Sequence, residues 1–169
     1  MVRVERGSGR LYGVMLVLAA VVLLVDQLTK LWAVSALSGG ERVAVVPPLI
    51  HFRLLYNPGA AFSLGSGSTW VFTLAAAAGV AGILYTARRL TSTAWALVLG
   101  AMLGGAVSHL GDRLFRAPGP ARGHVVDFID YGPFVGNVAD IALVGAAATL
   151  MLLTLRGVQL AGAPAEESA

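Results

Sequence analysis

Four long apolar stretches constrain this chain more than any other feature of its sequence. They cover residues 11–35, 69–88, 90–112 and 137–156, and each contains few charged residues. A run of about 20 apolar residues forms a helix long enough to cross the ~30 Å hydrocarbon core of a bilayer. The sequence therefore predicts an all-α membrane protein with four transmembrane helices, built as a single integral-membrane domain over residues 1–169.

The composition agrees with a bilayer as the main solvent. Apolar residues make up 57% of the chain and charged residues only 12%, whereas an average soluble domain has roughly 25% charged residues. Nine acidic and twelve basic residues are too few to cover a globule, and the basic residues form no stripe of the kind that binds nucleic acid. The absence of cysteine excludes disulfides, thiol nucleophiles and thiolate metal sites.

Four spans place both termini on the same side of the membrane. Arg88 and Arg89 occupy the short link between the second and third spans, where a preference of Arg and Lys for the cytoplasm is most informative. We therefore expect the link and both termini in the cytoplasm, although the basic residues divide equally between the two sides. The alternative for the first stretch is a cleavable signal peptide, but the apolar run continues past Lys30 and three more spans follow.

Two segments lie outside the spans on the opposite side of the membrane. Residues 40–62 contain two short β-prone runs around a Pro-Pro turn, which predicts a small extracytoplasmic sheet at the interface. Residues 113–136 are rich in Gly and Pro, and we expect them to form a loop that carries function. The tail, residues 162–169, is expected to be disordered.

Carboxylates inside a bilayer are costly, so each one that is kept there indicates a functional site. At a rise of about 1.5 Å per residue, Asp26 lies about 22 Å along the first span, Asp112 about 33 Å along the third, and Asp140 about 24 Å back from the end of the fourth. Asp127, in the outer loop, can fold back to the same level. We therefore expect one polar pocket near the outer leaflet to hold all four.

Asp127 and Asp140 are the best candidates for chemistry. Two carboxylates that are close together at low dielectric cannot both ionise, so one keeps a proton and the other can activate a water molecule as a base. The alternative is that intramembrane aspartates form a proton path or a structural network. Asp26 and Lys30, four residues apart on one helical face, have the ordinary arrangement of a structural ion pair.

Other polar residues at the ends of the spans have more than one interpretation. Asp112 and Arg113 are adjacent, so they point to different partners; Arg113 either holds a substrate carbonyl or extends to the interface, and spacing favours the second. Asn57 either bridges two polar groups or forms a turn before the second span. The three histidines lack the HExxH spacing, so no metal site is expected.

Six short motifs follow one another along nearly the whole chain. They are Asp26-Gln-Leu-Thr-Lys30, Asn57-Pro-Gly-Ala-Ala-Phe62, Gly104-Gly-Ala, Asp112-Arg113, Val125-Val-Asp127-Phe128 and Asn137-Val-Ala-Asp140. Each is short, but together they are specific. In order and spacing the chain resembles the bacterial lipoprotein signal peptidase family, signal peptidase II.

The resemblance implies an intramembrane aspartic endopeptidase of the plasma membrane, without metal or organic cofactor, that cleaves prolipoproteins before a diacylglyceryl-modified cysteine. It implies Asp127 and Asp140 as the catalytic residues, with a strand cradle and a half-helix over the site. We also expect a monomer whose partners are the lipid-modified precursor and membrane lipids. The expected pocket and substrate-binding residues are Asp26, Lys30, Asn57, Gly59, Phe62, His109, Asp112, Arg113 and Asn137.

The chain departs from the family pattern near two of these motifs. Ser108-His109 stands where the family has Gly-Asn, and Gly111 replaces a residue that is commonly apolar. Gly136 replaces the usual Phe before the last motif. An imidazole is larger than the Asn amide and can carry charge. The alternative to an active peptidase is therefore an impaired or transport-like membrane protein that uses its aspartates as a proton path or structural network.

Overall fold

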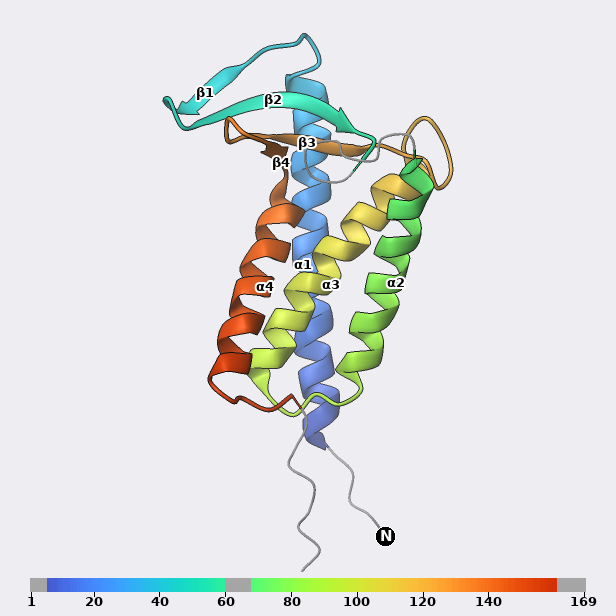
Figure 1. Ribbon diagram of the computed structural model, residues 1–169, viewed down its shortest axis with the longest axis vertical. Helices are drawn as coiled ribbons and strands as arrows, with labels where there is room; N and C mark the ends of the chain where they lie inside the picture. Colours follow the sequence, from blue (N-terminus) through green and yellow to red (C-terminus); the bar gives the residue numbers. More distant parts are fainter. Residues whose placement is uncertain (1–5, 60–67, 161–169) are drawn as a thin grey trace, which may run out of the picture.

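The computed structural model describes residues 6–59 and 68–160 of the chain. Its four long helices are each apolar enough to cross a membrane, and they coincide with the four predicted spans (Figure 1). The predicted class, a mostly helical four-span membrane protein, is confirmed. The helices are α1 (Arg6–Ala36), α2 (Thr69–Ala87), α3 (Thr93–Phe115) and α4 (Val138–Leu155).

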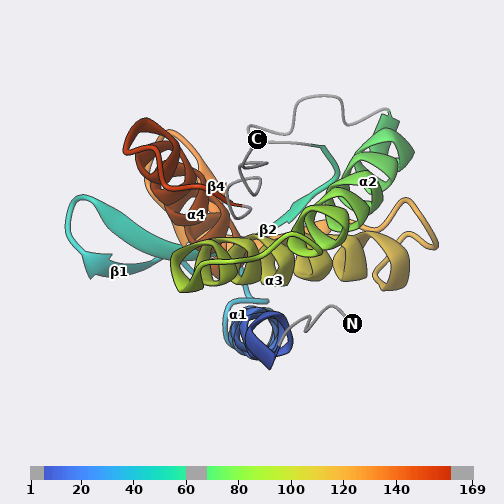
Figure 2. The same ribbon diagram turned by 90° about the horizontal axis from the view of Figure 1, so that it is seen from below.

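The helices alternate in direction, so the start of α1 and the end of α4 lie at one end of the bundle and the strands lie at the other (Figure 1). Helix α3 is central: it packs against the other three, and half of its most apolar stretch is buried, compared with 11–17% in the others. Helix α1 covers one side of α3, while α2 and α4 flank its opposite side (Figure 2). The outward faces of α1, α2 and α4 expose large apolar side chains that a bilayer would solvate.

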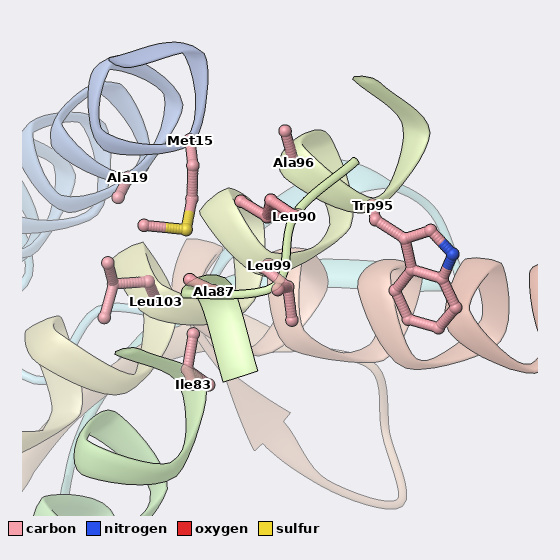
Figure 3. Close-up of a cluster of buried hydrophobic side chains, with 9 residues drawn as sticks. All are labelled: Met15, Ala19, Ile83, Ala87, Leu90, Trp95, Ala96, Leu99 and Leu103. Atoms are coloured by element: carbon pink, nitrogen blue, oxygen red, sulfur yellow. The ribbon is translucent and has the colours of Figure 1, made fainter. Parts of the chain in front are cut away.

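A buried apolar cluster joins α1, α2 and α3 in the half of the bundle away from the strands (Figure 3). Its only polar atom that needs a partner is the indole nitrogen of Trp95, which donates to the carbonyl of Val158 at 3.0 Å. This bond ties the segment after α4 to the start of α3. The cluster consists of Met15, Ala19, Ile83, Ala87, Leu90, Trp95, Ala96, Leu99 and Leu103.

Small residues let α3 approach its neighbours closely, as is usual in membrane helix packing. Gly100 and Gly104 face α1: a Cβ atom at Gly104 would lie 2.6 Å from the carbonyl oxygen of Ala19. Gly105 faces α4, where a Cβ atom would lie 2.8 Å from Cγ of Leu143. The three glycines therefore fix the position of α3 between α1 and α4.

The strands form one antiparallel sheet in the order β1-β2-β3-β4. The two strands predicted within residues 40–62 are confirmed as β1 (Val43–Val46) and β2 (Ile50–Asn57). The segment expected to form an outer loop, residues 113–136, also contains two strands that were not predicted, β3 (Val125–Asp130) and β4 (Val135–Gly136). Strand β3 pairs with β2, with Leu55 opposite Asp127.

The omission has a physical cause. Strand β3 is short, and the Gly- and Pro-rich residues on both sides of it make the whole segment look like a loop by composition. All six residues of the strand are nevertheless buried. The expected half-helix is not found between Arg116 and Asn137, a stretch that the structure describes in full. Phe62 and the tail, residues 162–169, lie outside the described residues.

The sheet rests on the end of α1. Ala33 and Leu37 pack against Phe128 and Ile129, and Trp32 makes edge-to-face contacts with Phe52 and Phe128 at centroid distances of 5.3 and 6.0 Å. Strand β1 projects beyond the helices and is exposed along its length (Figure 1). The contacts with α1 thus fix the level of β3 relative to the helices, and with it the level of Asp127.

Candidate functional site

A cavity of about 450 Å³ lies where α2, α3, α4 and the sheet meet. None of its described lining residues belongs to α1, and two of the helices that line it, α2 and α4, lie on the side of α3 away from α1 (Figure 2). Its apolar wall includes Phe72 and Ala76 of α2 and Val144 of α4. Six of the residues expected in the pocket line it, and they bring together most of the polar groups of the site: Asn57, Gly59, His109, Arg113, Asp127 and Asp140.

Strand β3 presents Asp127 to this cavity. The carboxylate is 2% exposed and accepts two amide hydrogen bonds, from Nδ2 of Asn137 to Oδ1 at 2.6 Å and from Nδ2 of Asn57 to Oδ2 at 2.9 Å. Burial raises the pKa of Asp127 to about 6, against the effect of the two amides and of His109, and the neighbouring Asp140 adds to the rise. Asp127 is therefore able to hold a proton close to neutral pH.

Helix α4 presents Asp140 from its first turn. Asn137 and Asp140 form a capping box, in which Oδ2 of Asp140 accepts from the backbone N–H of Asn137 at 2.9 Å and its own N–H donates to Oδ1 of Asn137 at 3.1 Å. The other oxygen, Oδ1, lies 3.1 Å from Nε2 of His109. The side chain of Asp140 is 39% exposed, so this carboxylate is the more accessible of the two.

Asn137 connects the two aspartates. Its side-chain nitrogen donates to Asp127, while its side-chain oxygen and backbone nitrogen bond to Asp140. It is fully buried and lies between β4 and α4, at the N-cap. The Asn-x-x-Asp spacing is thus explained locally, since a residue three positions after an N-cap is the one that a capping box joins to it.

Arg113 does not extend to the interface, and the expectation from spacing is wrong. The side chain is 5% exposed, and its guanidinium lies 5.7 Å from the ring centroid of Phe72. It donates to the carbonyl oxygens of Asn57, Pro58, Gly59 and Gly123. Buried carbonyls at the end of β2 need donors, and Arg113 supplies them. It thereby holds the turn that carries Asn57.

This turn also depends on Asn57 itself. Its Oδ1 accepts from the backbone N–H of Gly59 at 3.0 Å, while its Nδ2 donates to Asp127. Asn57 therefore both forms a turn and bridges polar groups, the two alternatives that the sequence left open. Gly59 contributes its backbone only.

Asp26, Lys30 and Asp112 do not join the cavity, so the prediction of a single pocket for all the aspartates is wrong. Nζ of Lys30 lies 2.6 Å from Asp26 and 2.7 Å from Asp112, and all three side chains are buried. Asp26 also accepts from Oγ of Ser108 at 2.5 Å and from the backbone N–H of Ala139 at 2.7 Å. The reason is that α1, which carries Asp26 and Lys30, packs on the side of α3 opposite the cavity.

The network is completed by Gln27 and Arg116, which sequence reasoning missed. Nε of Arg116 lies 2.6 Å from Asp112, and Gln27 bonds to Ser108, Asp112 and Arg116. Two carboxylates and two cations give a formally neutral group. Gln27 could have been predicted as a member of such a network, because it is a polar residue inside an apolar span.

Helix α3 thus carries two polar rows. Ser108 and Asp112 face α1, whereas His109 and Arg113 face the cavity. Residues four apart share a helical face and adjacent residues do not. The prediction that Asp112 and Arg113 serve different partners is confirmed.

The second carboxylate of β3, Asp130, lies apart from the cavity. Its Oδ2 is 2.9 Å from Nε of Arg53 and 3.1 Å from Arg42, and its Oδ1 accepts from Gly132 N–H at 2.8 Å. Burial acts to raise its pKa, but the Gly132 hydrogen bond and the two arginines outweigh burial and lower the pKa. Asp130 is therefore a structural carboxylate on the same strand as Asp127.

The fold is shared with known membrane enzymes. Two solved structures, both described as a bacterial membrane enzyme, superimpose with TM-scores of 0.74 and 0.72 at 22% and 23% identity. They cover 87% and 85% of this chain, and 90% and 94% of their own chains are matched. The chain therefore has the same fold as these two structures.

Sequence comparison gives the family. The family model for signal peptidase (SPase) II matches residues 18–156. A lipoprotein signal peptidase of Leifsonia xyli subsp. xyli is 46% identical over 89% of this chain, and one of Mycolicibacterium smegmatis is 50% identical over 85%. The matched regions cover 72% and 61% of these relatives. The chain belongs to the signal peptidase II family, and it is a membrane peptidase.

Proposed function

We propose that this chain is an aspartic endopeptidase that removes the signal peptide of lipoprotein precursors before a diacylglyceryl-modified cysteine. The family supports the reaction and the substrate, since the relatives are named lipoprotein signal peptidases. The aspartic type is supported by one observation: Asp127 and Asp140 line the same cavity and both bond to Asn137. The alternative of a structural role suits Asp26 and Asp112, whose charges are paired, better than it suits these two.

In the proposed reaction, a water molecule between the two carboxylates is the nucleophile. The ionised carboxylate takes a proton from this water as its oxygen attacks the scissile carbonyl carbon, and the protonated carboxyl donates to the carbonyl oxygen. In the second step the C–N bond of the resulting gem-diol intermediate breaks. The carboxyl that took the proton from water gives it to the leaving amine, and the other carboxylate takes a proton from a hydroxyl of the intermediate, which restores the pair with one shared proton. The raised pKa of Asp127, about 6, supports a pair that shares one proton.

The remaining polar residues of the cavity act as supports in this proposal. Asn57 and Asn137 orient the Asp127 carboxylate through their amides. Arg113 and Gly59 hold the turn that places Asn57. Their donors are engaged within the protein, so we assign them positioning roles, although the resemblance implied that they are pocket and substrate-binding residues.

The apolar wall of the cavity suits a signal peptide. Phe72 and Ala76 of α2 face Val144 of α4, and Val144 is 71% exposed on the side that a bilayer would cover. We expect the apolar segment of the precursor to lie along this wall. The lipid chains of the modified cysteine would then remain in the bilayer while the scissile bond reaches the aspartates.

The orientation follows from the arginines at the other end of the bundle. Four exposed arginines lie near the helix ends away from the strands: Arg10 near the start of α1, Arg88 and Arg89 after α2, and Arg156 after α4. Basic residues favour the cytoplasmic side, so we place this end and both termini in the cytoplasm and the cavity near the outer leaflet of the plasma membrane. A C-terminal tag should be accessible to protease only after the membrane is opened; labelling from outside intact cells would reverse the assignment.

A single chain supplies all the polar groups that the proposed reaction uses, and we expect a monomer. Light scattering with detergent correction should give the mass of one chain. A stable dimer that loses activity on dilution would contradict this part of the proposal.

The proposed function is tested by converting a synthetic precursor, with a diacylglyceryl cysteine, on a gel. Asp127→Asn and Asp140→Asn should each lower the rate by about 10²- to 10⁴-fold, the usual contribution of an acid or base. Asp130→Asn is the matched control, because Asp130 is a buried carboxylate of the same strand that does not line the cavity. If Asp127→Asn or Asp140→Asn processes the precursor at the parent rate, the aspartic mechanism is wrong.

A further inference from the structure

His109 is the one imidazole that lines the cavity among the described residues. Its ring is 20% exposed, and its Nε2 lies 3.1 Å from Oδ1 of Asp140. The family pattern has an Asn at this position, which is neutral at every pH. This chain therefore has a third group beside its two aspartates that can gain or lose a proton.

The charged groups that surround this ring come from several elements. Asp140 of α4 is in direct contact, Asp127 of β3 interacts with it through space, and Arg113 lies one turn further along the same helix. Lys30 of α1 and Tyr131 both interact electrostatically with Asp140. Helix α2 contributes only Phe72 and Ala76 to the cavity wall, and neither carries charge. Asp140 is thus the closest of these groups.

The two aspartates have unequal surroundings. Asp140 lies in the first turn of α4, accepts a backbone N–H, and has His109 beside its other oxygen. A helix N-terminus and an imidazole N–H at hydrogen-bond distance both favour a carboxylate in its charged form. Asp127 is almost fully buried and is bonded to two neutral amides.

From this geometry we infer that His109 is a positioning residue, which holds Asp140 as the ionised carboxylate and so leaves the shared proton on Asp127. The inference rests on the proposed function, since it assigns roles within the same pair. Asp140 would then be the base that activates water, and Asp127 the acid that polarises the scissile carbonyl. His109 acts through Asp140 and takes no part in bond breaking itself.

The assignment fixes the pH dependence of the reaction. With Asp127 as the acid, activity should fall as the pH rises through about 6 and Asp127 ionises. The His109 ring in contact with Asp140 favours ionisation of that carboxylate and, more weakly, of Asp127, so its removal should shift both limbs of the rate profile to higher pH. The acidic limb should move more, because Asp140 is in contact with the ring and Asp127 is not.

The test is the pH profile of kcat/KM for the full chain in detergent, with the diacylglyceryl precursor peptide as substrate. His109→Asn and His109→Gln should remain active and shift the acidic limb upward by about one pH unit, as expected for loss of a charge in contact. The basic limb, which ionisation of Asp127 sets, should move upward by less, so above pH 6 both variants should be faster than the parent. His51→Asn is the matched control, because His51 lies on β2 and does not line the cavity, and its profile should superimpose on that of the parent.

Two results would overturn the inference. If the limbs of His109→Asn and His109→Gln coincide with those of the parent, the ring does not set the protonation of the pair. If both variants are folded but inactive at every pH, the imidazole is itself catalytic. Failure of the proposed function is distinguishable, because Asp127→Asn and Asp140→Asn would then retain activity whatever the profile of the histidine variants.

Discussion

The two polar rows of α3 lie at the same level of the bundle but differ in how charge is balanced. Toward α1, Ser108 and Asp112 belong to a network in which Asp26 and Asp112 meet Lys30 and Arg116 at 2.6 to 2.7 Å. Toward the cavity, the aspartates have two neutral amides and an imidazole as their closest side-chain partners. A single helix thus separates a balanced group of charges from an unbalanced one.

The difference shows what each group can do. A buried ion pair pays a large desolvation cost, which is offset only when every charge has partners, and such a group is costly to disturb. The network meets this condition, because each carboxylate is paired with a cation. We therefore expect its groups to keep their charges. The cavity pair lacks balancing cations in contact, except for the imidazole, and Asp140 is accessible. We therefore expect proton exchange with a substrate and water on the cavity side.

Lys30→Met is the most direct test of whether the charge network on the α1 side is structural, and it has the largest expected effect on stability. It leaves Asp26 and Asp112 without their shared cation, and removal of one partner of a buried ion pair typically costs about 3–5 kcal/mol. Thermal unfolding in detergent should show this loss. Arg53→Met is the matched control, since Arg53 is half-exposed and Arg42 remains beside Asp130, and it should cost about 0–1 kcal/mol.

Asp127→Asn completes this test with the opposite expectation. It should lower precursor conversion by about 10²- to 10⁴-fold. Because Asn can still accept one of the two amide hydrogen bonds, it should lower the unfolding temperature less than Lys30→Met does. If it unfolds as readily as Lys30→Met, the two groups of charges are not different in kind.

Ser108→Ala tests whether the network and the cavity are independent, because Ser108 belongs to the network and the adjacent His109 lines the cavity. It removes the hydroxyl that donates to Asp26 at 2.5 Å and accepts from Gln27 at 2.8 Å. A hydrogen bond to a charged group is worth about 1.5–3 kcal/mol, so the stability should fall by that amount. The pH profile of the surviving enzyme should not move. A shift in the profile would show that the network and the cavity are electrostatically coupled.

Gly104→Ala gives the smallest expected effect. The new methyl group would lie 2.6 Å from the carbonyl oxygen of Ala19 and 2.7 Å from Cβ of Val22, so α1 must move away from α3. Overpacking of this kind costs about 1–3 kcal/mol, again measured by thermal unfolding. Gly79→Ala in α2, where a Cβ would meet nothing within 4 Å, should be neutral or slightly stabilising. Equal unfolding temperatures for the two variants would contradict the close α1–α3 contact.

The sequence predicted the parts of this molecule that depend on local pattern. The length of the apolar stretches predicted the four helices, and the Pro-Pro turn predicted β1 and β2. Because Asp112 and Arg113 are adjacent on a helix, they were expected to have different partners, as they do. Depth along each span correctly brought the aspartates to one end of the bundle. Depth carries no information about direction around a helix axis, however, and for this reason the two groups of charges were expected in one pocket.

The remaining features depend on contacts between distant segments. Strand β3 forms because β2 lies beside it, and the burial of Arg113 follows from carbonyls that the end of β2 leaves in need of donors. The apolar wall formed by Phe72, Ala76 and Val144 could not be found, since nearly every residue of the spans is apolar. The roles of Asp127, Asp140 and the residues around them stay predictions until the variants are measured.

The position of Asn137 has a consequence for how the site can change shape. Because this residue caps α4 and also bonds to Asp127, any displacement of β3 would carry the first turn of α4 with it. We therefore expect the distance between Asp127 and Asp140 to change little when the sheet moves. Adjustment to precursors of different bulk would then occur at the α2 side of the cavity, where Phe72 and Ala76 face the acids without bonding to them.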